Sequence, residues 1–174
     1  MAIERRALAA ELRAKGRRLE GYAATFGAEA RIRDYIETIA PGAFRDTLAE
    51  RGDVLALVDH DESRVLARTR SGTLRLAEDS RGLQFDLDLP NTSAANDVLA
   101  LAERGDLGGM SFAFTTRKGG DRWNAERREL RSVNLHEISV VSAFPAYDGT
   151  LVQARARPVL HPRVSLARRF LETL

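Results

Sequence analysis

The chain of 174 residues contains no cysteine, and this absence excludes several kinds of site. Disulfide bonds, thiolate ligands for metals and cysteine nucleophiles all depend on that side chain. Long hydrophobic runs are missing as well, because no stretch approaches the roughly 18 apolar residues that a transmembrane helix needs. The N-terminal segment mixes acids with bases and holds no apolar core, so it is not typical of a secretory signal. We therefore expect no membrane partner.

Aromatic side chains are scarce, at 6% of the chain, and the net charge is only +2. The basic residues are almost all arginine and are interleaved with acidic ones, except at the two ends of the chain. A nucleic-acid-binding protein usually concentrates its basic residues on one face and adds aromatic rings that stack on bases. The composition therefore favours no specific nucleic-acid partner. With 44% hydrophobic and 30% charged residues, it is typical of a globular domain with a substantial core.

The patterns that are present predict a mainly β chain. Alternating leucine and phenylalanine residues over 73–90 indicate a hairpin, whose turn carries Asp, Ser and Gly. Further strands are expected over 19–27, 54–60, 110–117 and within 127–144, and helices over 40–53 and 91–109. The last helix has Thr92 or Ser93 as its cap and Gly105 as its end, and 118–126 is expected to be an exposed loop. Together these elements indicate an α+β fold, mainly β, with six or seven strands in a barrel-like sheet and peripheral helices.

Three segments are expected along the chain. Residues 1–18 are predicted to form an N-terminal helix or a flexible arm, and residues 19–155 to form the folded domain. Residues 156–174 are an Arg-rich C-terminal tail whose last residues have a helical pattern. No internal repeat and no low-complexity tract divides the chain further.

The stretch GGMSFAF raises the question of whether its serine is a nucleophile. Phe112 and Phe114 share one face of the expected strand, which we take as the core face. Ser111 therefore points to the opposite face, where its hydroxyl could meet a substrate. Gly108 and Gly109 permit close approach of another backbone and could present an N–H group to an oxyanion. An ordinary hydroxyl at a turn is the competing interpretation.

Two other side chains reach the accessible face under the same parity rule. In LHEISVVS the apolar Ile138 and Val140 mark the core, so Glu137 points away from it, whereas His136 falls on the core side. In VLALVDH, taking the alternate leucines as core places His60 on the outer side. A neutral histidine can take the proton of a serine hydroxyl, and a carboxylate can hold that histidine in the required tautomer. Parity alone does not make these strands neighbours.

The acidic neighbours of the histidines leave other interpretations open. The clusters DHDE and HE contain imidazole and carboxylate groups, which are metal ligands. No helix carries the H-E-x-x-H spacing of a zinc hydrolase, however, so we expect no metal and no cofactor. A plain surface role for each histidine, including His161 in LHPR, is a further alternative.

The order of the segments resembles that of the prohead maturation proteases of tailed bacteriophages, the HK97-like family, which is distantly related to the herpesvirus assemblins. The similar stretches, in chain order, are GYAATFG, ETIAPGAF, VLALVDHDESRVLART, LRLAEDSRGLQFDLDLPNT, GDLGGMSFAF and LHEISVVSAFPAY. Together they span residues 19–148. The resemblance implies a serine endopeptidase with a barrel-like fold wrapped by helices.

The resemblance also implies a role for each candidate residue. It makes Ser111 the nucleophile, His60 the general base and Glu137 the acidic third member of a triad. The herpesvirus branch has a histidine as third member, so His136 is kept as the reserve. The two glycines before the nucleophile would form the substrate or oxyanion loop.

Two positions depart from the pattern of the family. Asp59 stands where the family usually has Asn, and Ala67-Arg68 stands where it often has Gly-Arg. Neither departure removes a candidate catalytic residue.

The resemblance implies processing inside an assembling procapsid, in the cytoplasm of a bacterial host. The expected partners are the major capsid protein with its scaffold segment, or a separate scaffold protein, and a homo-oligomer is a further expectation. The Arg-rich segment 155–169 would serve for self-cleavage or scaffold binding, since proteolysis concentrates at exposed polar termini. An inactive capsid-associated scaffold or structural protein of the same fold is the alternative, and a metal-dependent hydrolase is the third hypothesis.

Overall fold

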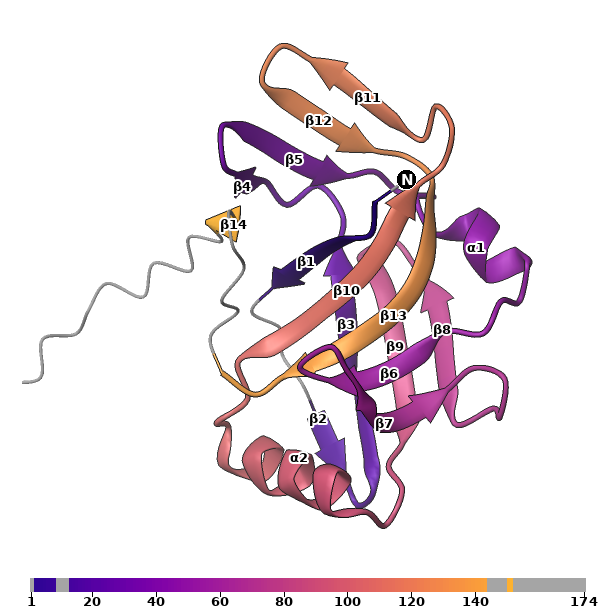
Figure 1. Ribbon diagram of the computed structural model, residues 1–174, viewed down its shortest axis with the longest axis vertical. Helices are drawn as coiled ribbons and strands as arrows, with labels where there is room; N and C mark the ends of the chain where they lie inside the picture. The colour runs from indigo at the N-terminus through magenta and orange to yellow at the C-terminus, as the bar shows by residue number, and fades with distance from the viewer. Residues whose placement is uncertain (1, 9–12, 144–149, 152–174) are drawn as a thin grey trace, which may run out of the picture.

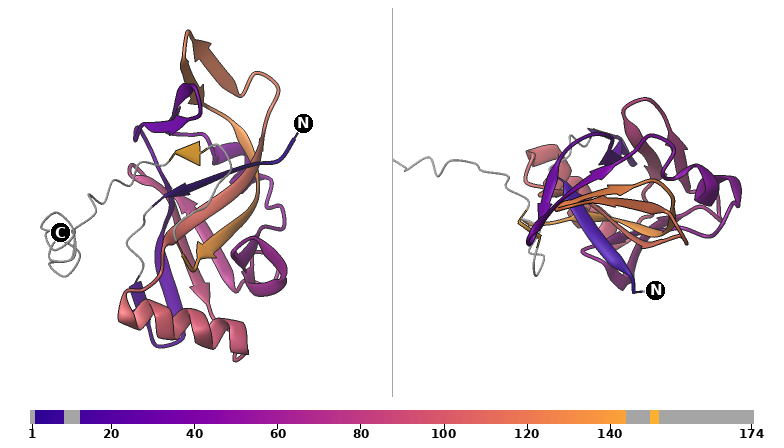
Figure 2. Two further views of the ribbon diagram at one scale, coloured as in Figure 1. Left: turned by 60° about the vertical axis from the view of Figure 1, so that its left-hand side comes forward. Right: turned by 90° about the horizontal axis from the view of Figure 1, so that it is seen from above.

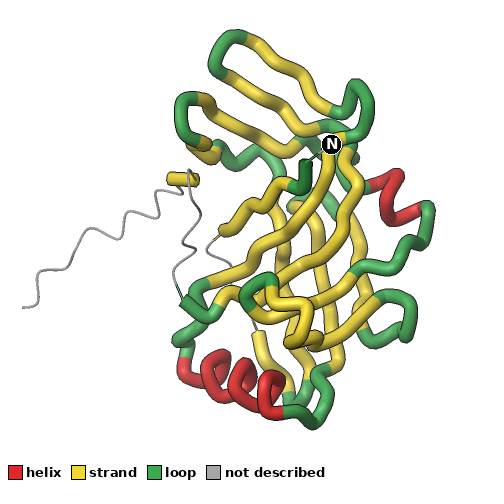
Figure 3. The backbone as a smooth tube through the Cα atoms, viewed as in Figure 1, coloured by secondary structure: helices red, strands yellow, loops and turns green. Residues whose placement is uncertain are grey.

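The computed structural model of the protein describes residues 2–8, 13–143 and 150–151, and these form a mainly β structure (Figure 1). Figure 3 shows strands over most of the described chain, together with two helices. The strands lie in three sheets, which we call the first, second and third sheets. No helix in the described part is long and apolar enough to cross a membrane. The expectation of a mainly β fold with few helices is confirmed.

The first sheet runs through the middle of the molecule and has the strand order β1-β10-β13-β6-β7. Its strands are β1 (Glu4–Leu8), β10 (Gly109–Thr116), β13 (Val133–Val141), β6 (Leu55–Val58) and β7 (Asp61–Arg68). The two long strands β10 and β13 pair antiparallel at its centre, whereas β13 and β6 run parallel. The first sheet therefore places segments that are far apart in the sequence side by side.

The third sheet packs against the inner face of the first and has the order β2-β3-β9-β8 (Figures 1 and 2). Its strands are β2 (Arg13–Lys15), β3 (Arg18–Thr25), β9 (Gly82–Asp88) and β8 (Leu74–Glu78). The hairpin expected over 73–90 is confirmed as β8 and β9, which pair antiparallel across a short turn. Their inward-facing leucines and Phe85 line the core.

The second sheet lies at one end of the molecule, at the top of Figure 1, and has the order β11-β12-β5-β4-β14. Its strands are β11 (Asp121–Asn124), β12 (Arg127–Leu130), β5 (Tyr35–Ile39), β4 (Ala30–Ile32) and β14 (Thr150–Leu151). The prediction of an exposed loop over 118–126 was wrong, because β11 forms a hairpin with β12. Three of the four β11 residues are exposed, so this strand has no alternating apolar pattern that a sequence could reveal.

The two helices lie at the edges of this framework. Helix α2 (Ser93–Arg104) covers the lower end of the molecule in Figure 1, as predicted from its pattern. Its cap is Thr92, which accepts a hydrogen bond from Ala95 N at 3.4 Å, and Gly105 ends it in a left-handed conformation with φ of 72°. Helix α1 (Arg45–Ala49) is a single short turn, shorter than the predicted 40–53.

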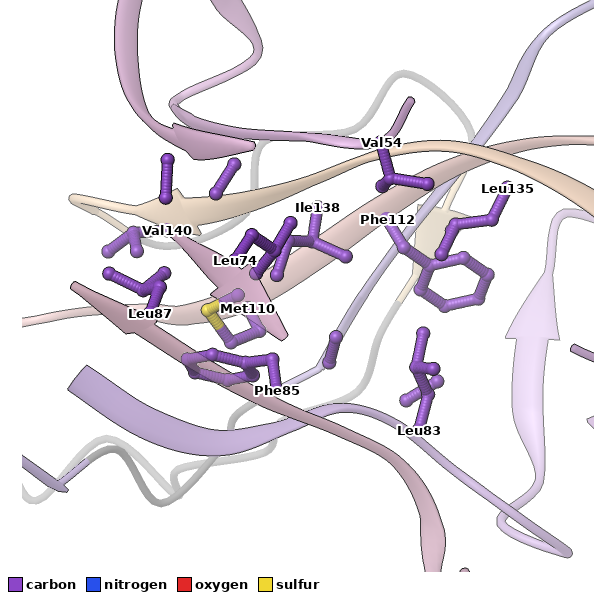
Figure 4. Packing of buried hydrophobic residues seen from close by; sticks show 14 of the residues in the cluster. Val54, Leu74, Leu83, Phe85, Leu87, Met110, Phe112, Leu135, Ile138 and Val140 are labelled. Carbon is purple, nitrogen blue, oxygen red and sulfur yellow. The ribbon is translucent and has the colours of Figure 1, made fainter. Parts of the chain in front are cut away.

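The core lies between the first and third sheets and is rich in large apolar side chains (Figure 4). Phe112 packs on Phe114 with ring centroids 5.3 Å apart, and Phe44 meets Phe112 edge-on at 5.6 Å. All three rings are buried, and burying each contributes about 1.5–3 kcal/mol to folding. This packing decides which face of β10 points inward, because Phe112 and Phe114 anchor one side of the strand.

A β-bulge in β13 decides which face Glu137 occupies. Glu137 and Leu135 lie opposite consecutive residues of β10, Ala113 and Phe114, so His136 has no Cα partner on that strand. One extra residue in a strand shifts the following side chains to the other face. Leu135 therefore belongs to the core, whereas Glu137, two residues later, shares the face of Ala113.

The predicted N-terminal boundary was wrong. Residues 1–18 were expected to form a helix or a flexible arm, but β1 and β2 lie within them and pair into the first and third sheets. The apolar pattern is hidden because Arg6 occupies a buried position, where it pairs with Glu37 of the second sheet. The domain therefore begins before residue 19, and the tail 156–174 lies outside the described residues.

The three sheets of the described chain are open, and no strand ladder joins the first sheet to the third. The expectation of a barrel-like sheet is thus not met as a closed barrel among these residues, although β10 packs beside β3. The described residues form 14 strands, more than the predicted six or seven. Strands as short as β2 and β4 are too brief to show an alternating pattern, so the sequence conceals them.

Candidate active site

Strand β10 holds Ser111 inside the first sheet, between β1 and β13. In register, Ser111 lies opposite Ala7 of β1 on one side and Ser139 of β13 on the other. Its side chain is on the face opposite Phe112, as the parity of the sequence predicted, and it is fully buried. The hydroxyl Oγ donates a hydrogen bond to the main-chain oxygen of Arg6 at 2.9 Å.

His60 lies in the tight turn that joins β6 to β7, directly before the first residue of β7. Asp59 and His60 both have left-handed backbones, with φ of 51° and 61°. Such conformations cost a non-glycine residue about 1–2 kcal/mol each, so other contacts must hold the turn. Asp59 N donates to Val140 O at 2.9 Å, and the Asp59 carboxylate accepts from Ser142 N at 2.8 Å and Ser142 Oγ at 2.7 Å.

The parity argument for β6 was wrong in its detail. The core cluster contains Ala56 and Val58, whereas Leu57 faces the side of Ser139, its Cα partner on β13. The expectation for His60 had Leu55 and Leu57 on the core face, and the structure places the smaller Ala56 and Val58 there instead. His60 nevertheless comes to the outer face, since the left-handed turn and not strand alternation directs it.

Glu137 meets His60 from the neighbouring strand. Its Oε1 lies 2.5 Å from His60 Nδ1, and its Oε2 accepts a hydrogen bond from Ser139 Oγ at 2.5 Å. Both side chains are almost buried, with 12% exposure for His60 and 10% for Glu137. The reserve candidate His136 is exposed, and its Nε2 lies 3.1 Å from Thr115 Oγ1. The bulge thus leaves His136 exposed and directs Glu137 toward His60.

The contact with Glu137 defines the tautomer of His60. A carboxylate only accepts hydrogen bonds, so Nδ1 carries the proton that the ring donates to it. In the neutral ring Nε2 is then the unprotonated nitrogen and carries a lone pair. This is the arrangement that a histidine needs to act as a general base, with a negative charge positioned to stabilise the imidazolium.

A family model matches residues 3–162 of the chain, and it describes the caudovirus prohead serine proteases. The chain belongs to this family. No curated protein and no solved structure gives a significant match. The matched range includes β1 as well as Ser111, His60 and Glu137, which agrees with a domain that begins before residue 19.

The sequence of this member of the prohead serine protease family did not single out one polar residue that lies beside these candidates. Ser139 is fully buried, lies opposite Ser111 and contacts both His60 and Glu137. The signal was present, because Ser139 follows Glu137 by two residues and so shares its face of β13. Serine is common in strands and turns, and nothing in its spacing from other residues set it apart.

The two glycines before Ser111 differ in their surroundings. A Cβ atom on Gly108 would collide with the main-chain oxygen of Ala143, so close backbone approach explains this glycine. Its N–H group donates to Val141 O at 2.8 Å and is therefore already engaged. Gly109 has a φ of 141°, a conformation that residues with a side chain rarely adopt.

The acidic cluster around His60 does not converge on one point. Asp59 bonds to Ser142, whereas the Asp61 carboxylate accepts from Ser63 N and Ser63 Oγ on the other side of the turn. Within residues 2–8, 13–143 and 150–151, no three His, Asp or Glu side chains gather as ligands of a metal would. The hypothesis of a metal-dependent hydrolase therefore gains no support from the described part of the chain.

Proposed function

We propose that this member of the prohead serine protease family is an active endopeptidase with Ser111 as nucleophile, His60 as general base and Glu137 as orienting acid. Its substrates are scaffold protein or the scaffolding segment of the major capsid protein, and the protease itself. It acts within the assembling procapsid inside the host. The family supports a role in capsid maturation, and the triad and the substrates are our proposal.

The observation that carries the proposal is the short contact between His60 Nδ1 and Glu137 Oε1, made beside the strand of Ser111. Ser139 links the two parts, since it lies opposite Ser111 in register and accepts a hydrogen bond from His60 N at 3.2 Å. Paired residues of neighbouring antiparallel strands have Cα atoms about 4.5–5.5 Å apart. Nucleophile, base and acid therefore gather on one face of three adjacent strands.

In the first half of the reaction, Ser111 Oγ attacks the carbonyl carbon of the scissile peptide bond. The hydroxyl proton passes to His60 Nε2, and the imidazolium that forms is stabilised by the Glu137 carboxylate. The tetrahedral intermediate then collapses, the C–N bond breaks, and the leaving amine takes the proton from His60. The product of this half is an ester between Ser111 and the new C-terminal acyl group.

In the second half, water attacks the ester carbon and gives one proton to His60. Collapse of that intermediate breaks the ester bond and returns the proton to Ser111 Oγ, so the enzyme is restored. The negative oxygen of each intermediate needs backbone N–H donors. Of the two glycines, only Gly109 keeps this role in our proposal, because the N–H group of Gly108 is engaged with Val141.

Co-expression with the major capsid protein of the same phage or prophage tests the proposal. Wild-type protease should shorten the capsid protein or its scaffold by a defined segment, measured by intact mass. The Ser111→Ala variant should leave it at full length, and wild-type activity should persist in EDTA. Unchanged processing by the variant would contradict the proposal, and full-length capsid protein with both would favour an inactive structural protein.

Self-cleavage is tested in the same samples. The Arg-rich segment 155–169 lies outside the described residues, and we propose it for self-cleavage or scaffold binding. Mass spectrometry should find a shortened C-terminus in wild type and an intact one in Ser111→Ala. An intact C-terminus in both after long incubation would count against self-cleavage.

A further inference from the structure

Ser139 occupies the centre of the candidate active site, although it is neither nucleophile, base nor acid. It lies in register between Ser111 of β10 and Leu57 of β6, and its side chain is fully buried. It also stands two residues from Glu137 on the same face of β13. This position allows one hydroxyl group to reach elements that the chain contributes from separate segments.

Both bonds of the Ser139 hydroxyl go to the candidate catalytic groups. Its Oγ donates to Glu137 Oε2 at 2.5 Å and accepts from His60 N at 3.2 Å. The other carboxylate oxygen, Oε1, lies against His60 Nδ1. The main chain of His60 is therefore hydrogen-bonded to Ser139 and its ring to Glu137, and these two partners are hydrogen-bonded to each other.

The backbone conformation of the turn that contains His60 requires stabilising contacts of this kind. Two successive left-handed residues, Asp59 and His60, are unfavourable and persist only where surrounding contacts determine them. Asp59 is held through Ser142 and Val140. Of these contacts, only that of Ser139 also reaches the carboxylate that faces the imidazole.

A merely structural serine would use its hydroxyl differently. On a buried strand, such a group commonly bonds back to nearby main-chain atoms of its own segment. Ser139 instead donates to a carboxylate and accepts from a turn that lies 79 positions earlier in the sequence. A donor to Oε2 restricts the rotation of the Glu137 carboxylate and so directs Oε1 toward His60.

We propose that Ser139 is a positioning residue, which aligns the Glu137 carboxylate and the His60 backbone so that the imidazole faces Ser111 correctly. This inference rests on the proposed function of the triad. It adds a residue that acts through Glu137 and His60 and touches no substrate.

The test is covalent labelling of Ser111 by a fluorophosphonate, a probe of serine nucleophiles that needs no known substrate. The rate is measured by intact mass over a range of probe concentrations, which separates the maximal rate from half-saturation. Ser139→Ala should lower the maximal rate by about 10- to 100-fold, the loss that misplacement by about 1 Å causes. The probe concentration that gives half of the maximal rate should change by less than about twofold, because the pocket that binds the probe keeps its shape.

Two further variants separate positioning from packing. Ser139→Thr keeps the hydroxyl and should be labelled faster than Ser139→Ala, whereas a packing role predicts the reverse order. Ser132→Ala removes another serine-to-carboxylate bond, from Ser132 Oγ to Asp46 Oδ2 at 2.9 Å, away from the site. It should be labelled at the wild-type rate.

A second measurement does not depend on activity. The proton on His60 Nδ1 should give a low-field NMR resonance, assigned by its loss in His60→Ala, and Ser139→Ala should shift or broaden it. Wild-type labelling together with an unchanged resonance in Ser139→Ala would overturn the inference. If the wild type itself is not labelled, the proposed function fails, and the resonance alone then decides the positioning role.

Discussion

Two buried glutamates in this protein have opposite surroundings. Glu37 of β5 is 2% exposed and accepts hydrogen bonds from Arg6 Nε at 2.5 Å and Arg128 Nη1 at 3.1 Å. The side chain of Glu137 of β13 is 10% exposed and is bonded by the Ser139 hydroxyl and the His60 ring. One carboxylate is bonded by two guanidinium groups, and the other by a hydroxyl group and an imidazole ring.

The difference separates a structural charge cluster from the candidate active site. Burial alone lowers the pKa of Arg6, but the hydrogen bonds and charges of Glu37 and Glu4 outweigh it and raise that pKa. This charge cluster joins β1 of the first sheet to the second sheet and is already satisfied. Glu137 is instead bonded by the Ser139 hydroxyl and the His60 ring, so its charge is placed to stabilise an imidazolium that develops on His60.

The largest effect is expected from Ser111→Ala. Removing the nucleophile should lower peptide cleavage by about 10⁴-fold or more and abolish labelling by a fluorophosphonate. Stability should fall by only about 1 kcal/mol, the value of the hydrogen bond to Arg6 O. Urea unfolding and labelling of the same samples measure both. A labelled variant would show that another residue is the nucleophile.

The two histidines should differ sharply. His60→Ala should lower the labelling rate by about 10²- to 10⁴-fold, because it removes the general base. His136→Ala is the matched control, since that side chain is exposed and bonds to Thr115. It should change the rate by less than about twofold. The opposite ranking would make His136 a member of the site.

Glu37→Gln should affect stability more than reactivity. It removes the buried carboxylate that Arg6 and Arg128 share. The two arginines keep only the partly exposed carboxylates of Glu4 and Asp121, and breaking a buried ion pair costs up to about 3–5 kcal/mol. Urea unfolding should register the loss. The labelling rate of Ser111 per folded molecule should stay within about threefold of the wild-type rate. A much lower rate in a variant that remains folded would show that Glu37 also supports the candidate active site.

The smallest effect concerns acid stability. Burial raises the pKa of Glu4, but hydrogen bonds and charges from Arg128 and Arg6 outweigh it, so the pKa lies below its ordinary value of 4.5. A carboxyl with a lowered folded-state pKa contributes stability above its unfolded-state value, and this is lost as the pH falls through the folded-state value. Because Glu4 is partly exposed, we expect less than about 1 kcal/mol.

Glu4→Gln should remove this contribution. The difference in unfolding free energy between wild type and variant should be present at neutral pH and shrink on acidification. A series of urea titrations at decreasing pH measures it. A difference that grows toward acid pH would contradict the assigned direction.

The face on which Ser111 lies was predictable from the sequence, because Phe112 and Phe114 mark the core side of β10. The hairpin over 73–90 and the Thr92 cap of α2 were predictable for similar reasons, since each depends on residues close together in the chain. Glu137 was assigned to the correct face by the residues that follow it, Ile138 and Val140. These features all follow from local pattern and packing.

The remainder depends on contacts between distant segments. The bulge at His136 arises from pairing with β10, and the left-handed turn at His60 is held by residues about 80 positions away. Buried arginines break the rule that charged side chains lie outside, so Arg6 concealed β1 as a strand. Sequence alone could not show that Arg6 finds Glu37 across two sheets.

The most direct test compares the two glutamates in one assay, the labelling rate of Ser111 per folded molecule in Glu137→Gln and Glu37→Gln. An amide at position 137 cannot hold the His60 tautomer as a carboxylate does, and the rate should fall by about 10³- to 10⁴-fold. Glu37→Gln should remain near the wild-type rate despite its lower stability. Equal rates in Glu137→Gln and wild type, with Ser111 labelled in both, would contradict the assignment of Glu137 to the triad.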